Sequence, residues 1–420
     1  MALKPVDRRH LLKFSGAAII AGALIEPSWL RAEELETHPG RPEPIGPAEF
    51  QARVSRAQAL MQQQGFAALI VEPGSSLVYF TGIRWWRSER LTCAIIPATG
   101  EVSVVTPFFE EPSIRESLAI DAQVRTWLEH EDPLAVVAAI LSSMRDRSGA
   151  IGIEETSRHF IVDGLQRNLP AAPIRNGAPI VRGCRMVKGP SEIALMQYAT
   201  DITVAAYRYT IPRVRTGMGP ADITSIMKTA TERLGGNSEF EMALIGEAAA
   251  YPHGSGKPQI VRAGDIVLMD CGCSVEGYQS DVSRTFVLGT PSARQRKVWN
   301  DVRQGQQVAF RAAKLGVPAG SIDDAVRRYY ESLGYGPDYR LPGLSHRTGH
   351  GIGLDGHEPI NLVRGEAGVL QPGMCFSNEP GLYIPGEFGV RLEDCFFMTE
   401  QGPKWFSTPS TSIEQPFAPG

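Results

Sequence analysis

Two aspartates, Asp270 and Asp281, lie in a stretch whose pattern predicts a β-hairpin. Asp270 ends the apolar run 266–269, and Asp281 opens a second strand after a turn marked by Gly277. With the turn centred just before residue 276, the two aspartates lie directly opposite, with Cβ atoms about 5 Å apart. Two adjacent carboxylates raise one pKa strongly unless a counter-charge is present. The pair therefore predicts a divalent cation, and the alternative is a surface hairpin whose aspartates face water.

A second acidic hairpin follows later in the chain. His350 stands in GHGIG, where glycines let the backbone approach closely. Glu379 falls in the predicted strand MCFSNEPG and Glu393 in the predicted strand GVRLEDCFF. Four carboxylates and one imidazole suit a pair of divalent ions such as Mn²⁺, Co²⁺, Fe²⁺ or Zn²⁺. Such pairs hydrolyse substrates with a bridging hydroxide, and the alternative for His350 alone is an ordinary packing residue.

The rest of the chain divides into segments that position these residues. Alternating strand and helix patterns over 48–184 predict an α/β domain, and no nucleotide-binding fingerprint follows its strands. Residues 185–420 predict an α+β domain, with helices from Pro190, over 220–234 and over about 292–315. The Pro- and Glu-rich residues 33–47 form a linker. A net charge of -4 over 420 residues excludes a basic surface for nucleic acid.

The N-terminus, residues 1–32, predicts a targeting signal. It combines a basic start containing Arg8, Arg9 and Lys13 with an apolar run that is short for a membrane span. The paired arginines resemble a twin-arginine signal, which indicates export to a bacterial periplasm by the twin-arginine machinery. Residues 30–32 are the nearest cleavage candidate, and the site is poor. Retention as a membrane anchor, or a cytosolic protein with a basic tail, are the alternatives.

Six cysteines lie in predicted strands or near the acidic motifs. The pair Cys271 and Cys273 lacks the second pair or the histidine partners of a soft-metal site. We expect this pair to be structural, because free cysteine behaves as a small buried hydrophobe, and we expect no required disulfide among the six. The six are Cys93, Cys184, Cys271, Cys273, Cys375 and Cys395.

The contexts of the acidic residues carry a resemblance to a known family. In order, GYQSDVSRTF, HRTGHGIGLDGHE, NEPG and GVRLED resemble the pita-bread metallopeptidases: Xaa-Pro aminopeptidases, prolidases and methionine aminopeptidases. The similarity spans about 185–415. In the first domain, VYFTG and IIPATGE are similar to the creatinase-type domain, which small methionine aminopeptidases lack. The implied fold is an α/β creatinase-type domain over 48–184, followed by an α+β pita-bread catalytic domain over 185–420.

The resemblance implies a role for each acidic residue. Asp281 and Glu393 would bridge two divalent ions, of which Mn²⁺ is foremost. Asp270 would hold one ion, and His350 with Glu379 the other. Glu379 would also act as general base on the bridging water.

Three further residues match catalytic positions of the family. His253 in YPHGSG and His357 in LDGHE would contact the scissile peptide and the developing oxyanion. Arg391 lies two residues before Glu393, on the same strand face, and would orient substrate or brace the carboxylates. His346 has no implied ligand role and is expected to make structural hydrogen bonds.

Adjacent tryptophans, Trp85 and Trp86, follow VYFTG in a predicted loop. In the family, a loop of this domain caps the active site of the neighbouring subunit. The resemblance therefore implies a homodimer or dimer of dimers in which these indoles form an apolar wall for a proline ring. The alternative is ordinary packing at a domain interface.

The resulting hypothesis is hydrolysis of small peptides at Xaa-Pro bonds. Alternatives on the same fold are a creatinase-like amidinohydrolase, a metal-dependent lyase and a binding protein without activity. The complete ligand set weighs against the first and the last, and Cys273, where the lyases have an acid, weighs against the second. The sequence leaves open the metal, the preferred peptide length and the physiological substrate.

Overall fold

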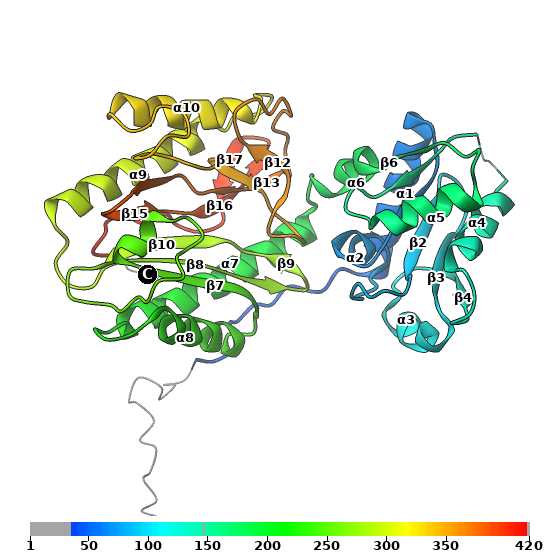
Figure 1. The fold of residues 1–420 in the computed structure, drawn as a ribbon, viewed down its shortest axis with the longest axis horizontal. Helices are drawn as coiled ribbons and strands as arrows, with labels where there is room; N and C mark the ends of the chain where they lie inside the picture. Colours follow the sequence, from blue (N-terminus) through cyan, green and yellow to red (C-terminus); the bar gives the residue numbers. More distant parts are fainter. Residues whose placement is uncertain (1–34, 146–147, 418–420) are drawn as a thin grey trace, which may run out of the picture. The chain divides into compact units, whose positions relative to one another are not determined.

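The structure is a computed structural model that describes residues 35–145 and 148–417 (Figure 1). The predicted signal, 1–32, lies outside the described residues. Within the described part of the chain, no helix is long and apolar enough to cross a membrane. Residues 35–46 of the linker have no regular secondary structure, and Arg41 pairs with Glu276 at 2.8 Å. The linker is therefore tied to the hairpin that carries the first two aspartates.

The first domain is built on one mixed six-stranded sheet in the order β4-β3-β2-β1-β5-β6. The central strand β1 pairs antiparallel with β2 and parallel with β5. Almost every residue of β1 is buried, as its apolar run requires. The strands are β1 (Phe66–Val71), β2 (Cys93–Pro97), β3 (Val102–Pro107), β4 (Ala122–Trp127), β5 (Ala150–Ile153) and β6 (Ile174–Asn176).

Six α-helices accompany this sheet. The first ends at Gly65, whose left-handed φ of 70° lets its N–H cap the Met61 carbonyl. Leu134, Val137 and Leu141 share one face of the fourth helix and join the core over the sheet. The helices are α1 (Pro47–Gln64), α2 (Ser75–Thr81), α3 (Glu111–Ser117), α4 (Pro133–Ser143), α5 (His159–Asn168) and α6 (Ala178–Arg185).

The second domain holds two larger sheets and a small one. One has the order β10-β8-β7, with β9 paired to β8, and the other has the order β12-β11-β13-β16-β17. The strands are β7 (Asn237–Ile245), β8 (Ile266–Val275), β9 (Tyr278–Gln279), β10 (Val282–Val287), β11 (Gly349–Gly351), β12 (Glu358–Leu362), β13 (Cys375–Asn378), β14 (Gly381–Ile384), β15 (Phe388–Arg391), β16 (Asp394–Thr399) and β17 (Gly402–Trp405). The predicted α/β and α+β classes are confirmed.

Four long helices cover these sheets. Helices α7 (Pro190–Thr210) and α8 (Pro220–Arg233) pack on the first sheet, and α9 (Ala293–Ala312) and α10 (Gly320–Ser332) pack on the second (Figure 1). In the core, Trp299 of α9 is fully buried and donates its indole N–H to the Thr285 carbonyl at 2.9 Å. Helix α10 was not predicted, although Ile322, Val326 and Tyr330 recur every four residues and are buried.

The two larger sheets meet where the acidic residues lie. The Glu393 N–H donates to the Ser283 carbonyl at 3.1 Å, in an isolated bridge between β10 and the residue before β16. This bridge brings the segment with Asp270 and Asp281 against the segment with Glu379 and Glu393.

The predicted register of the first hairpin was wrong by two positions. Asp270 pairs with Ser283, so Asp281 lies one step along the diagonal on the same face rather than directly opposite. The turn residues are Glu276 and Gly277, with φ of 51° and 83°. The expected turn would have placed the β-branched Val275 at a positive φ, which is costly. Because the shift is two residues, both aspartates still face the same side.

Candidate active site

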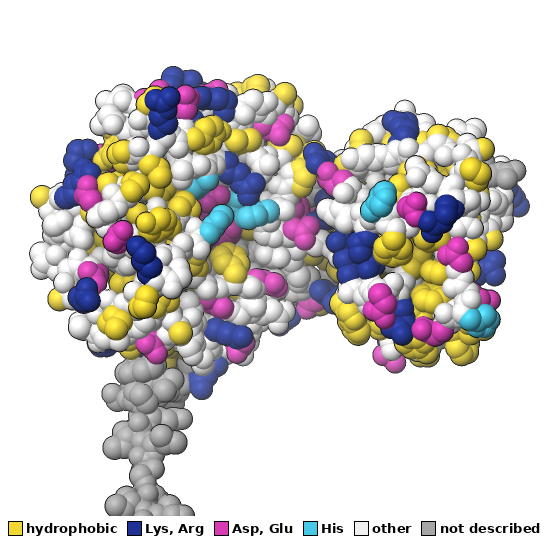
Figure 2. All heavy atoms as spheres, viewed as in Figure 1, with side chains coloured by type: hydrophobic (Ala, Val, Ile, Leu, Met, Phe, Trp, Pro, Cys, Tyr) yellow, Lys and Arg dark blue, Asp and Glu magenta, His cyan; other side chains and the backbone are white. Residues whose placement is uncertain are grey.

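The predicted acidic residues line one cavity of about 1200 Å³. Histidine side chains gather at a hollow in the second domain, beside acidic and basic side chains (Figure 2). All eight metal and catalytic residues predicted in this domain line the cavity, and His346, for which no ligand role was expected, lines it as well. The eight are Asp270, Asp281, His253, His350, His357, Glu379, Arg391 and Glu393.

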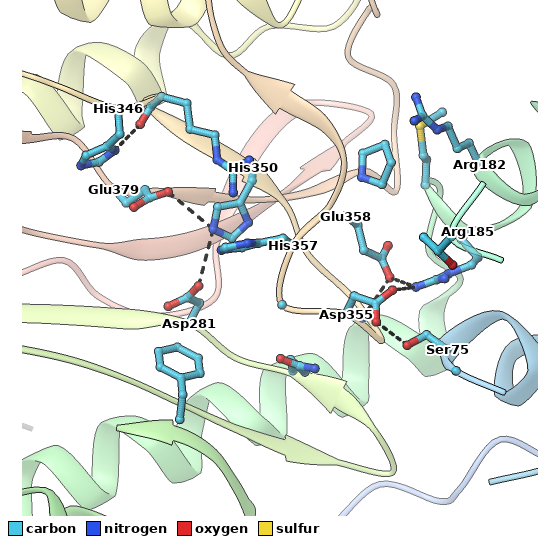
Figure 3. Close-up of a pocket in the computed structure, with 18 of the residues that line it drawn as sticks. Ser75, Arg182, Arg185, Asp281, His346, His350, Asp355, His357, Glu358 and Glu379 are labelled. Atoms are coloured by element: carbon cyan, nitrogen blue, oxygen red, sulfur yellow. Dashed lines mark hydrogen bonds and ion pairs between the residues drawn. The ribbon is translucent and has the colours of Figure 1, made fainter. Parts of the chain in front are cut away.

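Asp281, His350 and Glu393 form the buried centre of this cavity. Their ligand atoms lie within 4.8 Å of one another. His350 Nε2 is 3.6 Å from Asp281 and 3.5 Å from Glu379, and both carboxylates point toward the ring (Figure 3). Burial, followed by the charge of His357, holds the pKa of His350 well below its ordinary value, so the ring is neutral. The Gly351 carbonyl accepts from Nδ1 at 3.0 Å, which leaves the Nε2 lone pair facing the carboxylates.

This centre fits divalent cations on its own geometry. Asp281 Oδ1 and Glu393 Oε1 are buried and have no hydrogen-bond partner among the described residues. Burial and the neighbouring carboxylates raise the pKa of Asp281 and of Glu393 well above their ordinary values. Orphaned, mutually repelling carboxylate oxygens beside a neutral imidazole nitrogen need a positive charge between them. The donor set suits the hard or borderline ions expected from the sequence.

Arg391 braces the carboxylates. Its Nη2 donates to Asp270 Oδ2 at 2.6 Å, and its Nε donates to Ser283 Oγ at 3.0 Å. Ser283 Oγ in turn lies 2.9 Å from Asp270 and 2.7 Å from Glu393. Arg391 also donates to the Tyr383 hydroxyl at 3.1 Å. One buried guanidinium therefore orients carboxylates from both sheets.

Glu379 and Glu393 lie at strand ends, although both were predicted within strands. The β13–β16 ladder stops at Asn378 and Asp394, and the next residues outward are Glu379 and Glu393. Burial raises the pKa of Glu379 to about 7, and the charge of Arg391 opposes that rise. A divalent ion beside this carboxylate would lower its pKa again, because a positive charge favours the ionised form.

The other three histidines of the cavity differ in their exposure and hydrogen bonding. His357 is exposed to the cavity, and its ring lies edge-on to His350 with centroids 4.2 Å apart. His253 is also exposed, in the loop after the short helix η4 (Gly246–Ala250). His346 Nε2 lies 2.7 Å from the Tyr383 hydroxyl, and Nδ1 lies 2.7 Å from the Arg347 carbonyl. Both ring nitrogens of His346 are therefore engaged by protein atoms.

The two tryptophans are stacked on each other rather than on the cavity. Their ring centroids are 4.6 Å apart at 17°, and Trp86 is 66% exposed. Neither Trp85 nor Trp86 is among the residues that line the cavity. All six cysteines are buried free thiols.

A buried ion cluster holds the loop that carries His357. The Glu358 carboxylate accepts from Arg185 at 2.5 Å and from Lys188 at 2.9 Å, and Arg185 also bonds Asp355 at 2.7 Å. Ser75 of α2 donates to Asp355 (Figure 3). A Cβ on Gly353 would meet the Glu358 carboxylate at 2.9 Å. The 353–358 loop is therefore wrapped around one carboxylate that basic residues before α7 neutralise.

We expect Glu358→Gln to lower stability most above pH 5. Burial alone would raise the pKa of Glu358, but Lys188 and Arg185 lower it from 4.5 to about 2. A depressed pKa stabilises the fold above the unfolded value, and this contribution is lost as pH falls toward 2. The pKa shift corresponds to roughly 3 kcal/mol in the free energy of unfolding, in line with the ~3–5 kcal/mol cost of breaking a buried ion pair. Urea unfolding of the wild type and the variant at pH 7 and pH 3 measures this difference.

The control for this prediction is Glu387→Gln. Glu387 pairs with Arg294 on the surface, at 3.1 Å, with both side chains more than two-fifths exposed. Such pairs contribute about 0–1 kcal/mol. Equal losses in the two variants, or a Glu358→Gln deficit that is as large at pH 3 as at pH 7, would contradict the assigned linkage.

Several site residues were not predicted from the sequence. Ser283 could have been found from the sequence, because the correct register of the hairpin places it opposite Asp270. Glu358 and Arg347 adjoin predicted residues in HRTGHGIGLDGHE. Lys188 and Glu358 are 170 residues apart, so no local pattern joins them.

Together, the two domains and the acidic, imidazole-containing centre define a metallopeptidase. A model described as "Metallopeptidase family M24" matches residues 194–400, and one described as "Creatinase/Prolidase N-terminal domain" matches residues 53–187. The chain belongs to metallopeptidase family M24.

Relatives and solved structures agree with this assignment. The "Probable dipeptidase PepE" of Mycobacterium tuberculosis is 32% identical, over 84% of this chain and 93% of that one. The "Xaa-Pro dipeptidase" of Lactobacillus helveticus is 32% identical, over 79% and 90%. The crystal structure of dipeptidase PepE from Mycobacterium ulcerans has a TM-score of 0.80 at 30% identity, covering 90% and 99%. A recombinant prolidase from Thermococcus sibiricus has a TM-score of 0.78 at 27% identity, covering 86% and 97%.

Proposed function

We propose that this metallopeptidase hydrolyses small peptides at Xaa-Pro bonds and uses two divalent ions, with Mn²⁺ foremost. The observation that carries the proposal is the convergence of two orphaned carboxylate oxygens and the His350 Nε2 lone pair on one buried point. The relatives named Xaa-Pro dipeptidase and prolidase support the choice of substrate.

Each residue of the centre has a place in this mechanism. Asp281 and Glu393 would be shared by both ions, Asp270 would hold one ion, and His350 with Glu379 would hold the other. Divalent ions in such a site supply Lewis acidity and lower the pKa of water. Arg391 orients Asp270 through its 2.6 Å charge-assisted hydrogen bond.

The residues facing the cavity handle the substrate and its protons. The Glu379 carboxylate accepts a proton from the attacking water and returns it to the nitrogen of the departing residue. The His357 and His253 rings face the carbonyl of the scissile bond and donate to its oxygen as negative charge develops.

A substrate panel with the purified, metal-supplemented protein tests this function. The panel contains Ala-Pro, longer Xaa-Pro peptides, creatine and dimethylsulfoniopropionate, each with Mn²⁺, Co²⁺ or Zn²⁺. We expect cleavage of Xaa-Pro peptides and no turnover of the other two. Turnover of creatine or dimethylsulfoniopropionate, without Xaa-Pro cleavage under any metal, would replace this proposal with an amidinohydrolase or a lyase.

The assembly that we propose is a homodimer or a dimer of dimers, in which Trp85 or Trp86 reaches the cavity of the neighbouring subunit. The exposed indole of Trp86 supports it. We expect Trp85→Ala and Trp86→Ala to raise KM for Xaa-Pro peptides while metal content stays unchanged, because an apolar wall contacts only the substrate. Phe108→Ala removes another exposed aromatic ring of the same domain and is the control. A strictly monomeric protein with full activity would disprove the capping role.

The localisation that we propose is the bacterial periplasm, reached through the twin-arginine machinery. An Arg8→Lys, Arg9→Lys double variant is expected to accumulate in the cytoplasm as active enzyme, because recognition depends on the arginine pair. Fractionation with an activity assay measures this, and Arg31→Lys, outside the pair, is the control. Export of the double variant at the normal level would rule out this route.

A further inference from the structure

Five arginines line the cavity, and four of them are neutralised by carboxylates. The neutralised ones form the pairs Arg87–Glu72, Arg182–Glu155, Arg185–Glu358 and Arg391–Asp270. The fifth, Arg347, has no carboxylate within ion-pair distance among residues 35–145 and 148–417. The lining contains no lysine. Arg347 is therefore the uncompensated cation of the cavity wall.

A neutral partner holds Arg347 beside the metal centre. Its Nη1 donates to Asn361 Oδ1 at 2.9 Å. Asn361 lies on β12, directly across the ladder from His350 on β11. An amide partner fixes the guanidinium without cancelling its charge. The remaining N–H groups of Arg347 make no hydrogen bond with the described residues, so part of the planar fork stays available for a ligand.

Arg347 shares the cavity with the groups expected to face the substrate. Its side chain lines the same cavity as His350, His357 and Glu379. A ligand held by the guanidinium would therefore lie in the same cavity as the metal ligands and the residue expected to contact the scissile bond.

A dipeptide in this cavity brings a negative charge close to the scissile bond, because its second residue carries the free carboxylate. The four paired arginines already have counter-charges, and Arg391 is buried under the carboxylates that it braces. An Arg fork binds a carboxylate through two parallel, charge-assisted hydrogen bonds. In a tripeptide the carboxylate lies one residue, about 3.3–3.6 Å, farther along, and a neutral amide takes its place.

We propose that Arg347 binds the C-terminal carboxylate of the substrate and makes the enzyme selective for dipeptides. This inference rests on the proposed Xaa-Pro peptidase function and adds the length and charge of the substrate to it.

The test compares Ala-Pro, Ala-Pro-amide and Ala-Pro-Ala with the metal-loaded enzyme. We expect the wild type to prefer Ala-Pro. We expect Arg347→Gln to lower kcat/KM for Ala-Pro by roughly 10- to 100-fold, the range for a hydrogen bond between charged groups. The kcat/KM values for the amide and the tripeptide should fall much less. The acid-to-amide ratio, which is kcat/KM for Ala-Pro divided by kcat/KM for Ala-Pro-amide, should therefore fall sharply in this variant. Arg347→Lys should restore part of the ratio, because it keeps the charge without the fork.

Two comparisons separate a binding role from a structural one. Arg182→Gln changes a cavity arginine that Glu155 already neutralises, and it should keep the wild-type ratio. Inhibition by proline should weaken in Arg347→Gln, whereas inhibition by prolinamide should change little. Thermal unfolding and metal content establish that each variant is folded and loaded.

The outcomes distinguish this inference from the function on which it rests. No cleavage of any of the three peptides by the wild type would overturn the proposed function. Cleavage with the same acid-to-amide ratio in the wild type and Arg347→Gln would overturn the role of Arg347 alone. A wild type that prefers Ala-Pro-Ala to Ala-Pro would overturn the selectivity for dipeptides.

Discussion

Asp281→Asn is expected to abolish binding of both proposed ions and to lower kcat/KM by about 10³-fold or more. Metal ions contribute several kcal/mol of transition-state stabilisation, and 1.36 kcal/mol corresponds to tenfold in rate. Asp281 Oδ1 is one of the two orphaned oxygens of the centre, so an amide removes a ligand that no neighbour replaces. Glu393→Gln should act in the same way. Metal analysis after reconstitution and initial rates on Ala-Pro measure both effects.

Unfolding temperatures give this prediction a second readout. Added Mn²⁺ should stabilise the wild type, because an ion that binds only the folded state shifts the unfolding equilibrium. It should have little effect on Asp281→Asn. Without metal, the variant should be at least as stable as the wild type, because the substitution relieves repulsion among buried carboxylates.

The control for Asp281→Asn is Glu276→Gln. Glu276 lies at the tip of the same hairpin and pairs with Arg41 and Arg84 at the surface. It should keep metal content and activity. Fewer than one ion per chain in the reconstituted wild type would contradict the two-ion model, and normal metal content in Asp281→Asn would contradict the role of this residue.

His357→Gln is expected to lower kcat by roughly 10² to 10³ while metal content stays unchanged. That is the usual cost of removing one donor to a developing oxyanion. His357 packs edge-on against His350 but is exposed to the cavity, and it is not among the three residues whose ligand atoms converge. His253→Gln should behave similarly, because His253 is exposed at the same cavity. Rates at saturating substrate, together with metal analysis, measure the effect.

Two further histidine variants serve as comparisons. His159→Gln alters an exposed histidine at the start of α5 and should leave kcat and metal content unchanged. His346→Gln breaks the hydrogen bond to Tyr383 and should lower the unfolding temperature. If metal content falls in parallel with activity in His357→Gln, the residue is holding the metal site together rather than acting on substrate.

The local chemistry of the centre could be predicted because it is encoded in short, distinctive stretches. Asp270 and Asp281 belong to one hairpin, and a side-chain period of two keeps them on one face even when the register is misjudged. The register itself was misjudged because Glu276 adopts a positive φ, which its residue type does not signal. His350 stood out through its flanking glycines, and Gly349 and Gly351 do leave no room for a Cβ.

The parts that could not be predicted depend on contacts between distant segments. Arg185 and Lys188 meet Glu358 only after α6, the start of α7 and β12 have packed together. Nothing in the sequence around Arg347 distinguishes it from the other arginines of the chain. Its significance comes from the fact that every other arginine of the cavity wall is paired, and only the folded chain reveals this.

The bridge between Ser283 and Glu393 has a kinetic consequence. It joins residues 110 positions apart, so closing it requires a long excursion of the chain. Hairpins such as β8–β10 form early because their contacts are local, whereas distant contacts cost loop-closure entropy and form late. Metal-binding capacity should therefore appear in the last step of refolding, and ions added at the start should slow unfolding much more than they accelerate folding.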